Sequence, residues 1–88
     1  RWPNKAAAYE AEHLSERARS LRDEALPAAR KAYAAIVLAF SHGAASALDV
    51  IDARRSLFAV DTDTTNALAD AAKARAAWAA ARHRLELP

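Results

Sequence analysis

Apolar residues recur at alternating spacings of three and four along almost the whole chain, on both sides of its single glycine, Gly43. Rows that repeat every seven residues are typical of helices that pair through a continuous apolar seam. Before Gly43 the rows are Ala11, Ala18, Ala25, Ala32 and Ala39, with Leu14, Leu21, Ala28 and Ala35. After Gly43 they are Val50, Leu57, Thr64, Ala71, Trp78 and Leu85, with Ala53, Val60, Ala67, Ala74 and Ala81. The pattern predicts an all-α fold: a long antiparallel helical hairpin of the coiled-coil type.

The expected boundaries of the two helices follow from the ends of these rows. One helix should run over about residues 5–40 and the other over about residues 47–86, with the tip of the hairpin at about residues 41–46. We expect residues 1–3 to form an irregular lead-in and Asn4 to cap the first helix. At 1.5 Å per residue, each arm would be roughly 50–60 Å long.

Two places interrupt the helical pattern. Pro27 removes one backbone hydrogen bond and costs about 3 kcal/mol inside a helix, so the first arm is either one kinked helix or two helices broken near Leu26. The segment 61–66 contains only Asp, Thr and Asn, which have poor helix propensity, so a loop is the alternative there. The rows keep their phase through both places. We therefore favour a kink at Pro27 and an uninterrupted second helix.

The residues around Gly43 carry the signals of a turn between two helices. Glycine adopts the left-handed conformation that commonly ends a helix, so Gly43 is expected to end the first one. Ser46 can cap the second helix, and Asp49 three residues later completes a capping box. His42 and Asp49 also have the charges that a helix C-terminus and N-terminus favour.

The apolar stripe of the second helix is wider than a two-stranded seam requires. Ile51, Phe58 and Leu68 lie beside its two rows. A stripe of that width predicts more than one neighbouring helix. We therefore expect the isolated chain to self-associate, most simply as a homodimer that forms a four-helix bundle.

Composition narrows the possible functions. Alanine supplies most of the apolar residues, so a conventional globular core is hard to build at this length. The net charge is only +2, and the positive and negative residues are interspersed, which gives no electrostatic case for nucleic-acid binding.

The absence of cysteine excludes thiol chemistry. The longest uncharged run, 32–48, is slightly short for a bilayer span. The chain begins without a basic and apolar leader, so we expect either that a leader was removed or that this is a segment of a larger protein.

Candidate chemical sites are weak. Glu10 and His13 have the spacing used in carboxylate-bridged metal sites, but a second such motif on a facing helix is missing from the sequence, and the hairpin would bring His13 near Arg75. Asp61 and Asp63 resemble the start of a calcium loop, yet the glycine and glutamate required at its sixth and twelfth positions are replaced by asparagine and alanine. We predict no enzymatic activity, no cofactor and no metal site.

The tip resembles a known family. The chain has an aromatic residue, then x-x-Gly, then x-x-Ser, and then a hydrophobic-Asp-Val-Ile-Asp-Ala run. This pattern is similar to the tip of the second periplasmic hairpin in TolC-type outer-membrane efflux channels. Phe40, Gly43, Ser46, Asp49 and Asp52 fall in step with that pattern. The resemblance covers the tip and the helix after it. The Leu26-Pro27 step before the tip and the Asp-Ala-Arg-Arg sequence after it are most similar to the heavy-metal-exporting branch of this family.

This resemblance implies a function and a set of partners. The chain would be part of the periplasmic portion of a bacterial outer-membrane protein, trimeric at full length. Its tip would contact a periplasmic adaptor (membrane fusion) protein, which connects the channel to an inner-membrane transporter. The residues of that docking tip are Phe40, Ser41, His42, Gly43, Ala44, Ala45 and Ser46. Well-known members carry a tyrosine at the position of Phe40 and an arginine at that of Ala45, and both take part in closing the channel.

The roles of Asp49 and Asp52 have two interpretations. From the sequence alone, Asp49 caps the second helix, and Asp52 pairs with Arg55. The resemblance implies instead that both face the channel lumen, where trimerisation would form acidic rings at the pore entrance and favour cations. One aspartate can do both. For the function of the whole chain, the alternative to a channel segment is a free-standing helical module that binds another amphipathic helix.

Overall fold

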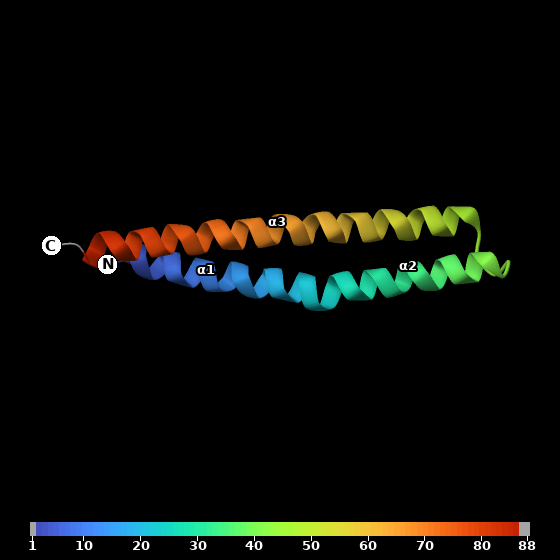
Figure 1. Ribbon diagram of the computed structural model, residues 1–88, viewed down its shortest axis with the longest axis horizontal. Helices are drawn as coiled ribbons and strands as arrows, with labels where there is room; N and C mark the ends of the chain where they lie inside the picture. The colour runs from blue at the N-terminus through green and yellow to red at the C-terminus, as the bar shows by residue number, and fades with distance from the viewer. Residues whose placement is uncertain (1, 87–88) are drawn as a thin grey trace.

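The computed structural model describes the backbone of residues 2–86 and the side chains of residues 5–84, and it shows a long all-α hairpin (Figure 1). Its extents are 70 × 15 × 15 Å. The turn lies at one end, and the first and last described residues lie at the other (Figure 1). The elements in chain order are α1 (Trp2–Ser20), the π-helix η1 (Leu21–Ala25), α2 (Leu26–Ser41) and α3 (Ala47–Glu86).

The first arm begins earlier than predicted, and the second arm continues without a break, as predicted. α1 already begins at Trp2, so Asn4 lies inside its first turn and does not precede it. α3 is uninterrupted from Ala47 to Glu86 and includes the polar segment 61–66. Within that segment the hydroxyl of Thr64 donates to the carbonyl of Val60 over 2.7 Å, which satisfies a polar group at a buried position.

The two arms meet along a seam of small side chains. Ala18, Ala67 and Ala71 form one buried cluster, against which Leu14 and Leu21 pack. Alanine lets the helices approach closely but removes little apolar area from water, so the stability of the hairpin depends on the length of the seam. The most buried positions are Ala11, Ser15, Ala18 and Leu26 on the first arm and Thr64, Ala67 and Ala71 on α3.

On α3 the predicted rows face the first arm throughout. Every predicted position from Val50 to Ala81 is buried or half-buried. The side chain of the last predicted member, Leu85, lies outside the described residues. Ile51, Phe58 and Leu68, which widen the stripe, are all exposed in the single chain.

The first arm bends where η1 joins α1 to α2, and it does not break (Figure 1). Pro27 is the second residue of α2. Ala25 and Leu26 both have right-handed helical dihedrals, so neither residue is extended, and the kink is confirmed. The bend coincides with η1, where the N–H of Leu26 donates to the carbonyl of Leu21 instead of to the residue four positions back. A π-turn of this kind accommodates one extra residue in the helix.

That extra residue changes which side chains face α3, and here the sequence prediction was wrong. The rows were expected to continue through Ala28, Ala32, Ala35 and Ala39. Ala39 is half-buried as predicted, but the other three are exposed. The half-buried positions are one residue later, at Ala29, Tyr33 and Ile36. A single added residue rotates the following helix by about 100° relative to the predicted rows. The π-turn therefore places larger side chains against α3 in the tip half.

Candidate functional site

The tip of the hairpin begins with a Schellman turn at the end of α2. Gly43 has a φ of 77° and is the one residue with positive φ in the described backbone. Its N–H donates to the carbonyl of Phe40 over 3.0 Å, and the N–H of Ala44 donates to the carbonyl of Ala39 over 2.8 Å. These two bonds satisfy carbonyls that a helix end leaves free. The predicted left-handed role of Gly43 is confirmed.

The carbonyl of Leu38 accepts hydrogen bonds from several donors at the same helix end. It accepts the backbone N–H of His42 over 3.2 Å and the hydroxyl of Ser41 over 2.6 Å. The ring Nδ1 of His42 also lies 2.9 Å from this oxygen, which assigns the proton to Nδ1. Ser41 and His42 are thus turned back onto the helix that they end, although both remain exposed.

A reciprocal capping box begins α3. The backbone N–H of Ser46 donates to Oδ2 of Asp49 over 2.9 Å, and the backbone N–H of Asp49 donates to Oγ of Ser46 over 3.1 Å. Both bonds satisfy N–H groups that the first turn of a helix leaves without partners. The predicted capping role of Asp49 is confirmed.

Asp52 does not have the partner expected for it. Within residues 5–84 the structure contains no ion pair between Asp52 and Arg55, so the predicted salt bridge is wrong. An ion pair on the described surface joins two neighbours, Arg22 and Asp23, over 2.7 Å. The hydrogen bond from Arg22 holds the pKa of Asp23 below its usual value. Asp49 and Asp52 are both exposed and lie three residues apart on α3, so their carboxylates are available on one side of the helix.

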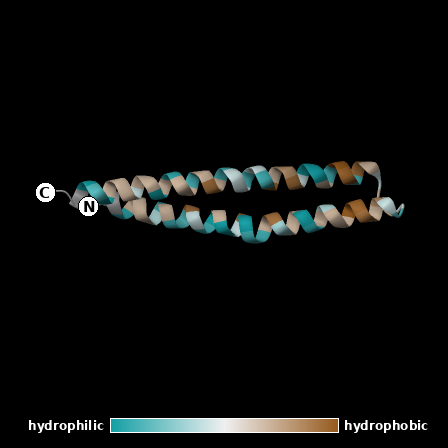
Figure 2. Cartoon of the chain, in the orientation of Figure 1, coloured by the Kyte–Doolittle hydropathy of each residue, from teal (hydrophilic) through white to brown (hydrophobic). Residues whose placement is uncertain are grey.

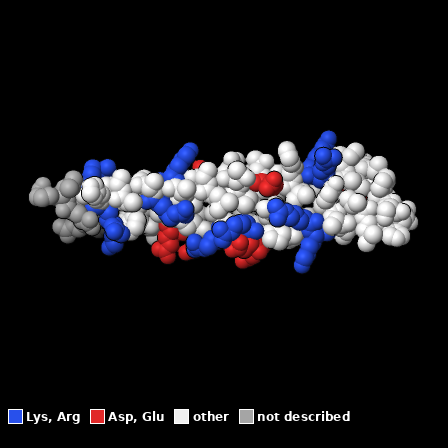
Figure 3. All heavy atoms as spheres, in the orientation of Figure 1, with Lys and Arg blue, Asp and Glu red and all other residues white. Residues whose placement is uncertain are grey.

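The remaining tip residues form an uncharged surface. Phe40 is 48% exposed, Ala45 is half-buried, and Ala44 is exposed. On the face drawn in Figure 3, no Lys, Arg, Asp or Glu lies at the tip end of the molecule. The most hydrophobic segments of α2 and α3 lie next to this end (Figure 2). The tip therefore combines exposed apolar side chains with small residues that leave the backbone accessible.

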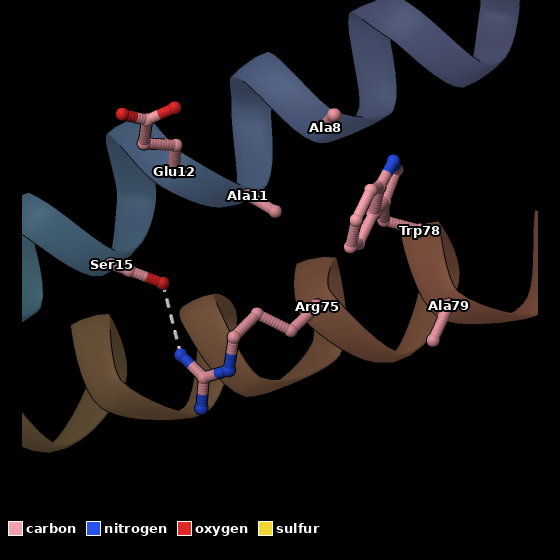
Figure 4. A pocket seen from close by; sticks show the side chains of 7 residues that line it. All are labelled: Ala8, Ala11, Glu12, Ser15, Arg75, Trp78 and Ala79. Carbon is pink, nitrogen blue, oxygen red and sulfur yellow. Dashed lines mark hydrogen bonds between the residues drawn. The ribbon is translucent and has the colours of Figure 1, made fainter. Parts of the chain in front are cut away.

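A second feature, which the sequence analysis missed, is a groove between the arms near the other end. Figure 4 shows Arg75 of α3 reaching toward Ser15 of α1, and its Nη1 donates to Oγ of Ser15 over 2.9 Å. Trp78 lies one turn further along, with the guanidinium of Arg82 4.8 Å from its ring centre. The groove has a volume of about 510 Å³ and is lined by Ala8, Ala11, Glu12, Ser15, Arg75, Trp78 and Ala79.

The indole nitrogen of Trp78 is a buried polar atom in this groove, although the ring as a whole is half-buried. This Nε1 is inaccessible to water and has no hydrogen-bond partner among the described residues. A buried N–H without an acceptor costs about 1–3 kcal/mol. The signal in the sequence was the position of Trp78 in the seam row, but the row could not indicate that its N–H would be enclosed.

Glu10 and His13, whose spacing was compared with that of metal sites, do not line a common depression. His13 is exposed on α1 and lines a shallow depression with Tyr9, Glu12 and Glu16, while Glu10 lines a different one. Among the described residues, no group of three His, Cys, Asp or Glu could hold a metal ion. No described helix has both the length and the apolar character needed to cross a bilayer.

Comparison with known proteins adds no relative to this picture. The chain matches no protein-family model, no curated protein and no solved structure.

Proposed function

We propose that this chain is a periplasmic coiled-coil hairpin of a TolC-type outer-membrane channel, working in a tripartite efflux pump. Three copies of the whole protein would form the tunnel, and the tip of each hairpin would contact the adaptor protein. The observation that supports this most is the tip itself. A Schellman turn at Gly43 is followed by a capping box from Ser46 to Asp49, at the spacing of the family pattern.

The acidic entrance in this proposal depends on Asp49 and Asp52. Asp49 uses Oδ2 in the capping box, and among the described residues its Oδ1 has no hydrogen-bond partner. Asp52 is exposed and unpaired within the same part of the chain. In a threefold assembly, each aspartate would be repeated around the axis, and the rings would attract cations into the mouth. A cap and a ring member are compatible roles for Asp49.

In this proposal, the adaptor docks against the accessible backbone around Gly43. A Cβ built at Gly43 would meet no atom within 4 Å, so the space beside this residue is free for a partner. The surrounding residues are small or uncharged, which allows the backbones of two hairpins to approach closely. Phe40 has no hydroxyl and Ala45 no charge, so we propose that the channel closes without the bonds these positions supply in well-known members. The resemblance to the heavy-metal-exporting branch makes metal cations the proposed cargo.

The test uses the trimeric protein that contains this hairpin, in a planar bilayer. The double substitution Asp49→Asn and Asp52→Asn removes two charges per copy while keeping side-chain size and some capping ability. We expect the variant to lose cation preference and to lose block by multivalent cations added on the periplasmic side. Asp61→Asn, elsewhere on the circumference of α3, is the matched control and should leave both properties unchanged.

The two possible failures of this experiment have different meanings. If conductance and selectivity are unaltered in the double variant, the two aspartates do not line the entrance. If the trimer no longer assembles, the same comparison is made with Asp52→Asn alone, because Asp52 has no capping role in the structure. Unchanged selectivity in that variant would remove Asp52 from the proposed ring.

A second candidate is a free-standing helical module that binds another helix. The observation that favours it is the apolar surface that the single hairpin leaves exposed on α3, where Phe58 is 72% exposed and Leu48 64%. Isolated apolar residues are common on protein surfaces, but a continuous row on one helix marks an interaction surface.

A further inference from the structure

α3 carries a second row of small and apolar side chains on its side away from the first arm. We call this row the outer seam. At 3.6 residues per turn, it lies about 150° around the helix from the row that packs against α1 and α2. All of its members are exposed, although the last one also lines the groove between the arms: Leu48, Ile51, Arg55, Phe58, Thr62, Thr65, Ala69, Ala72, Ala76 and Ala79.

The spacing of the outer seam is that of a coiled coil. Its members alternate at intervals of three and four residues for more than four heptads, with Arg55 as the one charged member. Three to four such heptads already indicate a helix pair. The outer edge of α1 lacks this character, because the exposed positions there include Glu12, Glu16 and Arg19. α3 therefore presents two interaction faces, and the single hairpin covers one.

Side-chain size changes systematically along the outer seam. Its large members, Leu48, Ile51, Arg55 and Phe58, lie toward the tip, and the three apolar ones are 64%, 47% and 72% exposed. From Ala69 to Ala79 every member is alanine. A well-packed partner must be small beside the tip half and large beside the other half. The outer seam of a second copy has that order of sizes when its helix runs in the opposite direction.

We propose that the outer seam is a self-association surface on which the α3 helices of two copies pack antiparallel. The alignment that places every large side chain opposite an alanine pairs Ile51 with Ala76 and Phe58 with Ala69 of the second copy. Leu48 then faces Ala79. The twofold axis passes between Thr62 and Thr65, so the contact is closed and stops at a dimer.

Charges beside the seam do not decide this alignment. Asp52 would lie near Lys73 of the second copy, which is attractive, whereas Arg54 would lie near Arg75, which is repulsive. Exposed charge pairs change stability little, whether they attract or repel each other. Packing decides instead. A parallel pair would set Phe58 against Phe58 at one end and leave alanine against alanine at the other, so the two helices could not keep one separation along their length.

This inference goes beyond both functions considered above and does not rest on the channel. The outer seam excludes Asp49, and none of its members belongs to the tip. In a channel wall the same surface would be covered by a different helix, whereas the 88-residue chain by itself has a second copy as its partner. The experiments below use that chain, so their failure leaves the conductance test of Asp49 and Asp52 unaffected.

The direction of pairing can be tested by disulfide cross-linking, because the natural chain has no cysteine. Ile51→Cys and Ala76→Cys are prepared separately, then mixed and oxidised. We expect a disulfide-linked heterodimer in the mixture and scarcely any linked dimer from Ile51→Cys alone. In the antiparallel pair, two cysteines at position 51 would be roughly 37 Å apart. Linkage of Ile51→Cys to itself as readily as to Ala76→Cys would overturn the proposal, and so would the absence of any linkage.

The location of the surface can be tested with two matched substitutions. Ala69→Glu places a charge opposite Phe58 in the proposed dimer, and Ala34→Glu makes the same change at an exposed position of α2. By sedimentation, we expect Ala69→Glu to raise the dissociation constant of the dimer at least tenfold and Ala34→Glu to change it less than twofold. Circular dichroism checks that both variants remain helical. Equal effects, or a natural chain that is monomeric at tens of micromolar, would contradict the proposal.

Discussion

The backbone N–H of Leu26 donates to the carbonyl of Leu21, five residues earlier, and the residues of α2 from Ala29 to Ile36 face α3 one position later than predicted. Without the extra residue, Ala32 and Ala35 would face α3. With it, Tyr33 and Ile36 do. The bond stands immediately before Pro27, the residue that has no N–H to continue the ordinary ladder. One π-turn thus accommodates the proline and places the larger side chains in the seam.

Deleting Glu24 together with Pro27→Ala should turn η1 into ordinary α-helix and stabilise the hairpin. The deletion removes the extra residue, so Ala29, Tyr33 and Ile36 keep their places against α3, and the substitution removes the interior proline. We expect the free energy of unfolding to rise by about 1–3 kcal/mol. Thermal unfolding followed by circular dichroism measures the change.

The matched control deletes Ala34, which lies in regular helix. That deletion should rotate Ile36 away from α3 and lower stability, because no extra residue is present there to be lost. If the Glu24 deletion with Pro27→Ala destabilises the hairpin as much as the Ala34 deletion, the π-turn does not set the register.

Gly43 should tolerate asparagine better than alanine, and alanine better than valine. A side chain at this position meets no atom within 4 Å, so the cost comes from the positive φ alone. We expect Gly43→Ala to lower the free energy of unfolding by about 1–2 kcal/mol and Gly43→Asn by less, since Asn visits this conformation more readily. Urea unfolding provides the measurement. Equal losses for Ala and Asn would mean that the turn is not limited by φ.

The same residue tests docking in the whole channel protein. Gly43→Val adds bulk at the proposed contact with the adaptor, so we expect efflux to be lost while trimers still assemble. Gly43→Asn, which preserves the turn, separates the effect of strain from that of bulk. Normal efflux by the valine variant would remove the tip from the docking surface.

Asp49 and Asp52 should differ in their contribution to folding. Asp49→Ala breaks one half of the capping box, and we expect a loss of about 1 kcal/mol. Asp52→Ala removes an exposed carboxylate that has no ion pair within the described residues, so stability should hardly change. Parallel denaturant titrations of the two variants give the comparison. A larger loss for Asp52→Ala would show an interaction that the single hairpin does not contain.

The contact between Ser15 and Arg75 should stabilise the pairing of the arms. Its two residues are 60 positions apart, so it forms only when the hairpin closes. In a double-mutant cycle with Ser15→Ala and Arg75→Ala, we expect a coupling energy of about 0.5–1.5 kcal/mol. A coupling near zero would mean that Arg75 remains in water in solution.

Local features of this protein could be predicted from its sequence because short-range physics determines them. Gly43 lacks the Cβ that opposes positive φ, and Ser46 and Asp49 are close enough in the chain to cap each other whatever surrounds them. The rows of α3 were also correct, since a helix without an interruption has one period from end to end. These features account for the hairpin and for the geometry of its tip.

Tertiary structure decided what depends on the other arm. The sequence showed Pro27 but not the extra residue before it, because the choice between Ala35 and Ile36 is made by packing against α3. It suggested Arg55 as the partner of Asp52, and the two do not meet, since exposed charges gain little from pairing. It could not join Ser15 to Arg75, because these residues are 60 positions apart and meet only when the hairpin closes.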